Sequence, residues 1–195
     1  MENQKLEKQS GNSDNTFNMG EYIKEGFNIV KTNPIPFIVG NLVLLIINGV
    51  AMGFLIGHWY AGMYYMVQKA RKGETVELTD VFWGFNNFIP IFVAGLIFSV
   101  GVGVGSMFCI IPGFIIGAIL FYLIPLVAFQ NAEIGDAINR SKEEAMKSLV
   151  NHILFFFIVS LISGIGFLLC GVGVLLTLPV GVAAMAVAYE DRLGK

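Results

Sequence analysis

The segment Ser99–Gly113, SVGVGVGSMFCIIPG, decides the fold, because its alternating glycines, serine and Pro-Gly pair allow two opposite interpretations. A phosphate-binding loop would need a lysine after the glycines, or a GxGxxG spacing with an acidic residue about 20 positions later. No lysine lies near Ser106, and the next acidic residue is Glu133. Phosphate would also be costly to bury among valine, methionine and phenylalanine without a cation. The segment is therefore predicted to be a packed helix followed by a turn.

The residues around this segment indicate a membrane. Ser99–Gly113 lies within Val81–Ala132, a run of 52 residues without Asp, Glu, Lys or Arg, and Thr32–Gln68 and Ser148–Tyr189 are similar runs of 37 and 42 residues. Hydrophobic residues make up 55% of the chain and charged residues only 13%. That charged share is about half of what a soluble globular domain carries. The chain is therefore predicted to be an integral membrane protein.

Each uncharged run is about twice the length of one membrane-spanning helix, which needs roughly 20 residues. We therefore expect an all-α, polytopic helical membrane protein with about six transmembrane helices arranged as three hairpins. The expected turns are Pro112-Gly113 and Cys170-Gly171 in the second and third hairpins, and a turn between Gly49 and Gly57 in the first. Because the first run is short, a count of five spans remains an alternative.

An amphipathic segment precedes each expected hairpin. Apolar residues recur at helical spacing over residues 19–30, 78–89 and 134–149, with polar residues between them. Helices of this kind lie in the membrane interface. The polar segment before the first of them, residues 1–17, is expected to be a disordered cytoplasmic tail. Residues 18–192 are then a single helical membrane domain.

The distribution of charge predicts the orientation. All 12 lysines and arginines lie in the tail, between the expected hairpins or after the last one, and none lies at an expected turn. By the positive-inside rule, both termini and all segments between hairpins face the cytoplasm. The net charge of −2 and the absence of a basic block give no sign of a nucleic-acid partner. The lipid bilayer is the expected partner.

The glycines are expected to pack helices together. Small residues four positions apart share one face of a helix and allow two backbones to approach closely in lipid. Packing within the monomer is favoured, and contact with a second copy or another membrane protein is the alternative. The expected helix-packing residues are Gly49, Gly53, Gly57, Gly101, Gly105, Gly113 and Gly117.

Polar residues within the uncharged runs are few. Asn41, Asn48 and Ser106 are candidates for lining a cavity, although hydrogen bonds between helices are the commoner use of such residues. No spacing suits a catalytic Ser/His/Asp or Cys/His set, a metal cluster or a cofactor motif. Cys109 and Cys170 leave open either a disulfide at the outer face or two small apolar side chains. The chain is not expected to be an enzyme.

The segments Ile110–Phe156 and Val174–Asp191 resemble a broad group of bacterial multi-pass membrane domains. The group includes uncharacterised families and the membrane domain fused to some glycerophosphodiester phosphodiesterases. The residues that carry the likeness are Pro112, Gly113, Pro125, Ala137, Ser141, Lys147, Pro179 and Tyr189. The resemblance implies a multi-pass protein of the bacterial cytoplasmic membrane. It implies no catalytic residue, because no phosphodiesterase domain accompanies it in this chain.

Two functions are expected on these grounds. The first is a non-enzymatic membrane scaffold or partner-binding protein of the cell envelope, in keeping with the absence of charged residues from the expected spans. The second is a transporter or channel for a small molecule or lipid, in keeping with the apparent threefold repeat and the prolines within spans. A polar cavity lined by Asn41, Asn48 or Ser106 would favour the second.

Overall fold

The computed structural model describes residues 17–108, 110–168 and 173–194, and over these ranges the chain forms helices and no strand. The prediction of an all-α fold is confirmed. The elements are α2 (Met19–Thr32), α3 (Pro34–Val50), α4 (Ile56–Arg71), the 3₁₀ helix η1 (Leu78–Phe85), α5 (Phe88–Phe108), α6 (Ile110–Ile119), α7 (Leu123–Gln130), α8 (Ile134–Lys147), α9 (Leu149–Leu168) and α10 (Val174–Leu193). Residues 1–16 of the expected tail lie outside the described part, and Phe17 is buried beside His152 and Phe155.

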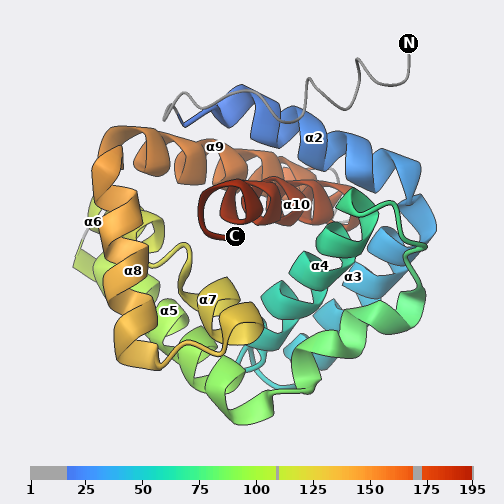
Figure 1. Cartoon of the computed structure of the whole chain (residues 1–195), viewed down its shortest axis with the longest axis horizontal. Coiled ribbons are helices and arrows are strands. Elements are labelled where there is room, and N and C mark those ends of the chain that lie inside the picture. The colour runs from blue at the N-terminus through green and yellow to red at the C-terminus, as the bar shows by residue number, and fades with distance from the viewer. Residues whose placement is uncertain (1–16, 109, 169–172, 195) are drawn as a thin grey trace.

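Helix α10 lies near the middle of the bundle (Figure 1). It packs against α2, α9, α4 and α3, and its segment Val182–Tyr189 is buried. Small residues at the contacts allow the neighbouring helices to pack closely against α10. A Cβ on Gly26 of α2 would lie 2.5 Å from the backbone nitrogen of Ala184, and one on Gly181 would lie 2.5 Å from Ser163 Oγ of α9. Close approach of this kind gains van der Waals contact in a lipid environment.

A sharp bend separates α2 from α3, and the two helices meet at 96°. A proline disfavours helical geometry at the residue before it, and Asn33 accordingly ends α2 with φ −123° and ψ 57°. Pro34 begins α3 at a position where its missing N–H would have no helical partner. The bend turns α2 onto α10, so that its residues Tyr22, Gly26 and Val30 are buried.

Four segments are long and apolar enough to cross a membrane, namely Phe88–Met107, Ile111–Gln130, Leu149–Gly166 and Val174–Leu193. A fifth is counted when the bent pair α2 and α3 is taken as one span. Helices α3 and α4 are 17 and 16 residues long, because the turn between them takes part of the first uncharged run. By length and composition the described residues hold four spans, or five with the bent pair, and the count of six spans in three hairpins stays a prediction.

The segment after Ser99–Gly113 contains a break that the uncharged run does not indicate. Helix α6 ends at Ile119 and α7 begins at Leu123. Ser141, which is fully buried on α8, occupies this break. Its hydroxyl donates to the Ile119 carbonyl at 2.6 Å and accepts from the Tyr122 N–H at 3.1 Å. The backbone groups that the break exposes are thus paired, as buried backbone requires.

The proline expected at the turn of the second hairpin lies within a helix instead. Pro112 lies in the first turn of α6 rather than in a loop, and Pro125 lies in the first turn of α7. Proline is tolerated in the first turn of a helix because the N–H it lacks would be unpaired there. The segment Gly101–Gly105 is helical as predicted. Cys109 and the turn Cys170-Gly171 lie outside the described residues.

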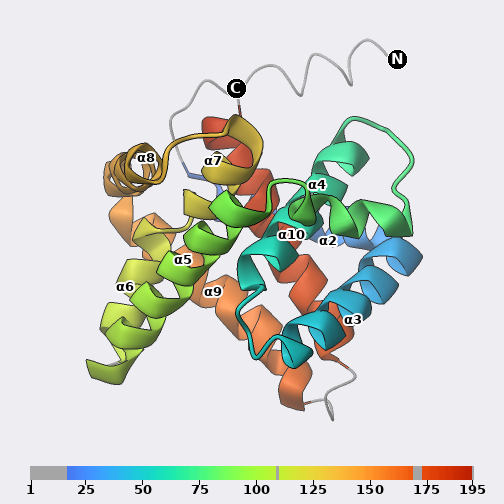
Figure 2. The ribbon, with the colours of Figure 1, turned by 90° about the horizontal axis from the view of Figure 1, so that it is seen from below.

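Charged side chains gather at one end of the bundle, where Figure 2 shows α7, α8 and the last turn of α10 opposite the turn between α3 and α4. Arg71, at the end of α4, contacts three carboxylates at 2.7–2.8 Å: Glu25 of α2 and both Glu190 and Asp191 of α10. A guanidinium offers several donors in a fixed planar geometry, which suits such an arrangement. Arg71 therefore fixes how three helices meet.

A second ion-pair cluster joins α8 to α10. Glu144 is buried, with 5% of its side chain exposed, and its two oxygens contact Arg192 at 2.7 Å and Lys147 at 2.6 Å. Burial alone would raise the pKa of Glu144, but the hydrogen bonds and positive charges of these two partners outweigh it and lower the pKa. Glu144 is therefore a charged carboxylate that holds α8 on the bundle.

Candidate binding pocket

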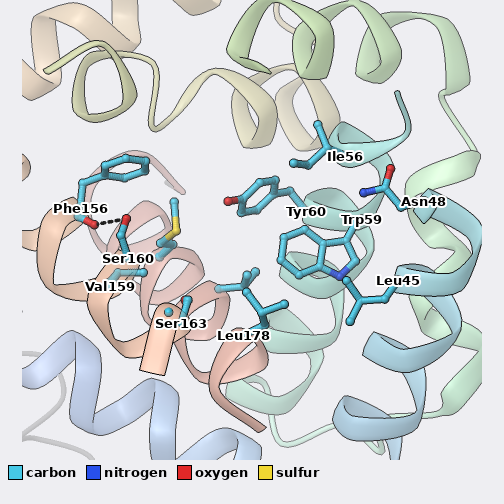
Figure 3. A pocket seen from close by; sticks show the side chains of 13 residues that line it. Leu45, Asn48, Ile56, Trp59, Tyr60, Phe156, Val159, Ser160, Ser163 and Leu178 are labelled. Carbon is cyan, nitrogen blue, oxygen red and sulfur yellow. Dashed lines mark hydrogen bonds between the residues drawn. The ribbon is translucent and has the colours of Figure 1, made fainter. Parts of the chain in front are cut away.

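A pocket of about 380 Å³ lies between the pair α3 and α4 and the pair α9 and α10 (Figure 3). Its volume falls at the lower end of the roughly 300–1,000 Å³ that small-molecule sites occupy. The residues that line it are Leu45, Asn48, Ile56, Trp59, Tyr60, Phe156, Val159, Ser160, Ser163, Gly164, Leu178, Val182 and Met185. None of these is charged.

Helical spacing brings the two main walls together. Ile56, Trp59 and Tyr60 lie on one face of α4, three and four positions apart. On α9, Phe156, Val159, Ser160 and Ser163 repeat the same spacing. In Figure 3 the residues of α9 lie on the opposite side of the pocket from Trp59, and the Tyr60 hydroxyl points across toward α9. The pocket thus has mostly apolar walls with a few polar groups.

Asn48 is the polar residue at the end of the pocket next to the turn between α3 and α4. Its Oδ1 accepts a hydrogen bond at 3.2 Å from the N–H of Leu55, seven residues later. This bond closes the turn, in which Gly53 has φ +86°, a conformation that glycine adopts without strain. Because Oδ1 is used in this way, the orientation of the amide is set and its NH₂ group is the side that remains available.

Asn41 lies behind the wall of the pocket rather than on it. Its side chain is fully buried, and its Oδ1 accepts a hydrogen bond from Trp59 Nε1 at 3.0 Å. Among the described residues its Nδ2 has no hydrogen-bond partner. Asn41 therefore holds the indole ring of Trp59 in the wall, and the ring separates the amide from the pocket.

Ser106 lies away from the pocket, on α5. Its hydroxyl donates to the Val102 carbonyl one turn earlier at 2.8 Å. Ser160 makes the same bond to the Phe156 carbonyl at 2.7 Å, but it lines the pocket. Of the three polar residues expected to line a cavity, the structure places only Asn48 in the wall. The sequence does not indicate the other residues of the pocket, such as Tyr60. They lie on helices that face one another across the pocket, and no local pattern in the sequence shows which helices do so.

The glycines expected to pack helices fall into two groups. A Cβ on Gly57 would lie 2.5 Å from the Ile91 carbonyl oxygen, one on Gly105 would lie 3.0 Å from Gly113 Cα, and one on Gly117 would meet the Phe156 ring at 2.5 Å. Gly101 similarly faces the side chains of Ile116 and Leu120, and the nearest atom is Leu120 Cδ1 at 3.1 Å. These glycines lie at tight contacts between α4 and α5, α5 and α6, and α6 and α9.

Gly49 and Gly53 are different, because a Cβ on either would meet no atom within 4 Å. The stripe of small residues expected from Gly49 through Gly53 to Gly57 is not continuous. Helix α3 ends at Val50, Gly53 lies in the turn, and Gly57 lies in the first turn of the next helix, α4. The spacing of four positions has no geometric meaning across a turn, since it applies only within one helix.

Two histidines are also buried in the bundle. His152 of α9 is 2.9 Å from the Tyr122 hydroxyl through Nε2 and 3.0 Å from the Ser148 carbonyl through Nδ1. His58 of α4 is 3.2 Å from the Phe88 carbonyl through Nε2 and packs on Phe85. No group of three or more His, Cys, Asp or Glu within the described ranges could hold a metal ion.

Over the part of the chain that the structure describes, the fold is all-helical, with several apolar helices able to span a membrane. The chain is similar to the uncharacterized protein Rv2560 of Mycobacterium tuberculosis, with 22% identity over 152 residues, and equally to the uncharacterized protein Mb2590 of Mycobacterium bovis. These alignments cover 78% of this chain and 46% of each relative, so the chain spans about half the length of the curated relatives it matches. No family model and no solved structure matches.

Proposed function

We propose that the chain is a multi-pass protein of a bacterial cytoplasmic membrane, with six crossings in three hairpins and both termini in the cytoplasm. Exposed apolar side chains on the outer faces of α3, α5 and α9, such as Ile46, Val100 and Leu161, support contact with lipid. The ion pairs of Arg71 and Glu144 lie at the end that this topology assigns to the cytoplasm. The turn between α3 and α4 carries no charge and lies at the other end.

Accessibility to a thiol reagent tests this topology. Both native cysteines are first replaced by alanine. A Met52→Cys variant, in the exposed turn between α3 and α4, is then expected to react with a membrane-impermeant maleimide in intact cells. A Glu74→Cys variant, in the exposed segment after α4, is expected to react only after the cells are opened. Labelling of Glu74→Cys in intact cells would overturn the proposed orientation.

We further propose that the protein is non-enzymatic and binds an uncharged small molecule or a lipid in the pocket between α3–α4 and α9–α10, as a carrier or channel for such a ligand would. The observation that supports this most is the pocket itself, which is of ligand size and combines apolar walls with the amide of Asn48 and the hydroxyls of Tyr60 and Ser160. Sites for small molecules are typically apolar with a few placed polar groups. A partner-binding scaffold has no need of such a space.

Native mass spectrometry with a pocket-filling variant tests the binding. Gly164 lines the pocket and is itself exposed, and a Cβ placed on it meets no atom within 4 Å, so Gly164→Leu adds a bulky side chain at the edge of the pocket without a backbone clash. Gly103 on α5 is equally open but lies outside the pocket, and Gly103→Leu is the matched control. We expect the wild type and the control to retain a ligand mass after gentle delipidation, and Gly164→Leu to lose it. Equal retention by all three, or no retained mass, would favour the scaffold instead.

A further inference from the structure

We propose that the ligand of this pocket is a single acyl chain that ends in an uncharged carbonyl or ester oxygen, with that oxygen at the NH₂ group of Asn48. This inference rests on the proposed function and adds the class of ligand and its direction in the pocket. Three features of the pocket carry it: the absence of charge from its described wall, the distribution of polar groups along its length, and the fixed orientation of one amide.

The first feature is the uncharged wall. None of the thirteen described lining residues is acidic, basic or histidine. An ionised group taken from water into such a site without a counter-ion loses most of its favourable solvation. The portion of the ligand that enters must therefore be neutral. An acyl chain satisfies this condition, whereas a free carboxylate or a phosphate does not.

The second feature is the distribution of polar and apolar residues along the helix axes. Asn48 lies near the end of α3, and Ser163 lies in the last two turns of α9 as the structure describes it. The residues farther along the pocket, Phe156, Val182 and Met185, are apolar. From Leu178 to Met185 the wall extends seven residues, about 10 Å of helix. Beyond the end at Asn48 the pocket is thus mostly apolar, with the hydroxyls of Tyr60 and Ser160 as its polar groups, and this arrangement suits a chain with one polar end.

The third feature is the Asn48 amide. Its Oδ1 accepts from the Leu55 N–H, so the NH₂ group is the free hydrogen-bonding side, and that group can only donate. A ligand atom at this position must accept a hydrogen bond. The Ser160 hydroxyl already donates to Phe156, and the Tyr60 hydroxyl points across the pocket. Carbonyl and ester oxygens are neutral acceptors, so they fit the NH₂ group without adding charge.

The pocket contains its own fluorescent reporter. The sequence has two tryptophans, Trp59 in the pocket wall and Trp83, which stacks between Tyr65 and Phe129 at ring distances of 4.8 and 4.6 Å. A Trp83→Phe variant keeps an aromatic ring in that stack and leaves Trp59 as the single tryptophan. A brominated acyl chain that enters the pocket then quenches the fluorescence of Trp59, because bromine quenches indole only at near contact.

The experiment adds a monoacylglycerol with a dibrominated chain to the Trp83→Phe protein in vesicles of unlabelled phosphatidylcholine. We expect saturable quenching, unchanged in a Gly103→Leu background and abolished by Gly164→Leu. Asn48→Asp keeps the oxygen that accepts from Leu55 but lacks the NH₂ donor, and it is expected to weaken binding about three- to tenfold. Thermal unfolding of each variant, followed by the same fluorescence, shows that the variant is folded.

Two further probes define the source and the charge of the ligand. Brominated phosphatidylcholine as the bilayer lipid shows whether membrane phospholipid supplies the chain, which requires quenching that Gly164→Leu removes. A brominated fatty acid, kept ionised at pH 9.5, is expected to bind at least tenfold more weakly than the monoacylglycerol at the same pH, and equal binding would overturn the requirement for a neutral end. Quenching that is linear and insensitive to Gly164→Leu would overturn the acyl-chain inference. A ligand mass that Gly164→Leu removes would then still support the proposed function.

Discussion

The contact between α2 and α10 gives a prediction whose size follows from the structure. A Cβ on Gly26 would lie 2.5 Å from the Ala184 nitrogen and 2.9 Å from its Cα, while ordinary contact begins at 3.4 Å. In a Gly26→Ala variant α2 must therefore retreat by about 1 Å, a gap that forfeits a quarter to a half of the dispersion energy of each contact. Gly20→Ala on the same helix is the control, because its Cβ meets only Asn18 Oδ1 at 3.9 Å.

Gly26→Ala gains about 1 kcal/mol of helix propensity in the interior of α2, and Gly20→Ala gains less in its first turn, so the difference between them is a lower bound on the lost contact. That difference is expected to be about 2 kcal/mol, the middle of the range for overpacked sites. For a chain of this size it corresponds to roughly 4–8 °C between the thermal midpoints, with Gly26→Ala the lower. The assay is fluorescence-detected size exclusion after heating in nanodiscs of one composition. Equal midpoints would show that α2 does not pack on α10 in the membrane and would refute the argument.

Three further predictions concern stability. Arg71→Met leaves three carboxylates without their cation and is expected to lower stability by about 3 kcal/mol, whereas the exposed neighbour Lys72→Met should change it by less than about 0.5 kcal/mol in the same thermal assay. Because the pKa of Glu144 is lowered in the fold, its contribution to stability is complete above the ordinary glutamate pKa and is lost as the pH falls through the pKa of the folded state. The thermal midpoint of the wild type should therefore fall more steeply on acidification than that of Glu144→Gln. Gly57→Ala is expected to lower the midpoint because its Cβ meets the Ile91 carbonyl at 2.5 Å, and Gly49→Ala, with no atom within 4 Å, should not.

Local patterns in the sequence predict the helices well but not the breaks between them. The apolar spacing over residues 19–30 and 134–149 corresponds closely to α2 and α8, because one buried face is enough to define an amphipathic helix. The interruption between Ile119 and Leu123 has no such signal. It depends on Ser141, a residue of a different helix, whose hydroxyl bonds both sides of the gap. A contact between distant parts of the chain produces no periodic pattern in the local sequence.

The pocket was predictable only in part for a similar reason. Asn48 is a polar residue in an apolar run, and the structure places it in the wall of the pocket. Asn41 fits the same description, yet it is buried behind Trp59. Helical spacing indicates which residues share a face, but it does not indicate which helix that face meets. The pocket arises because α4 faces α9 across α10, and the sequence carries no local sign of that pairing.

The unequal lengths of the helices have a consequence for the surrounding bilayer. At 1.5 Å per residue, α3 and α4 are about 26 and 24 Å long, whereas α5 and α9 are about 32 and 30 Å long. Helix α3 carries exposed apolar side chains, so on the proposed topology it meets the lipid with a shorter helix than α5 and α9 do, and the bilayer must thin beside it. Lipids at that edge are compressed relative to those elsewhere around the protein. Leu45 and Asn48 of α3 also line the pocket, so the hydrophobic mismatch falls beside the site proposed for a lipid chain.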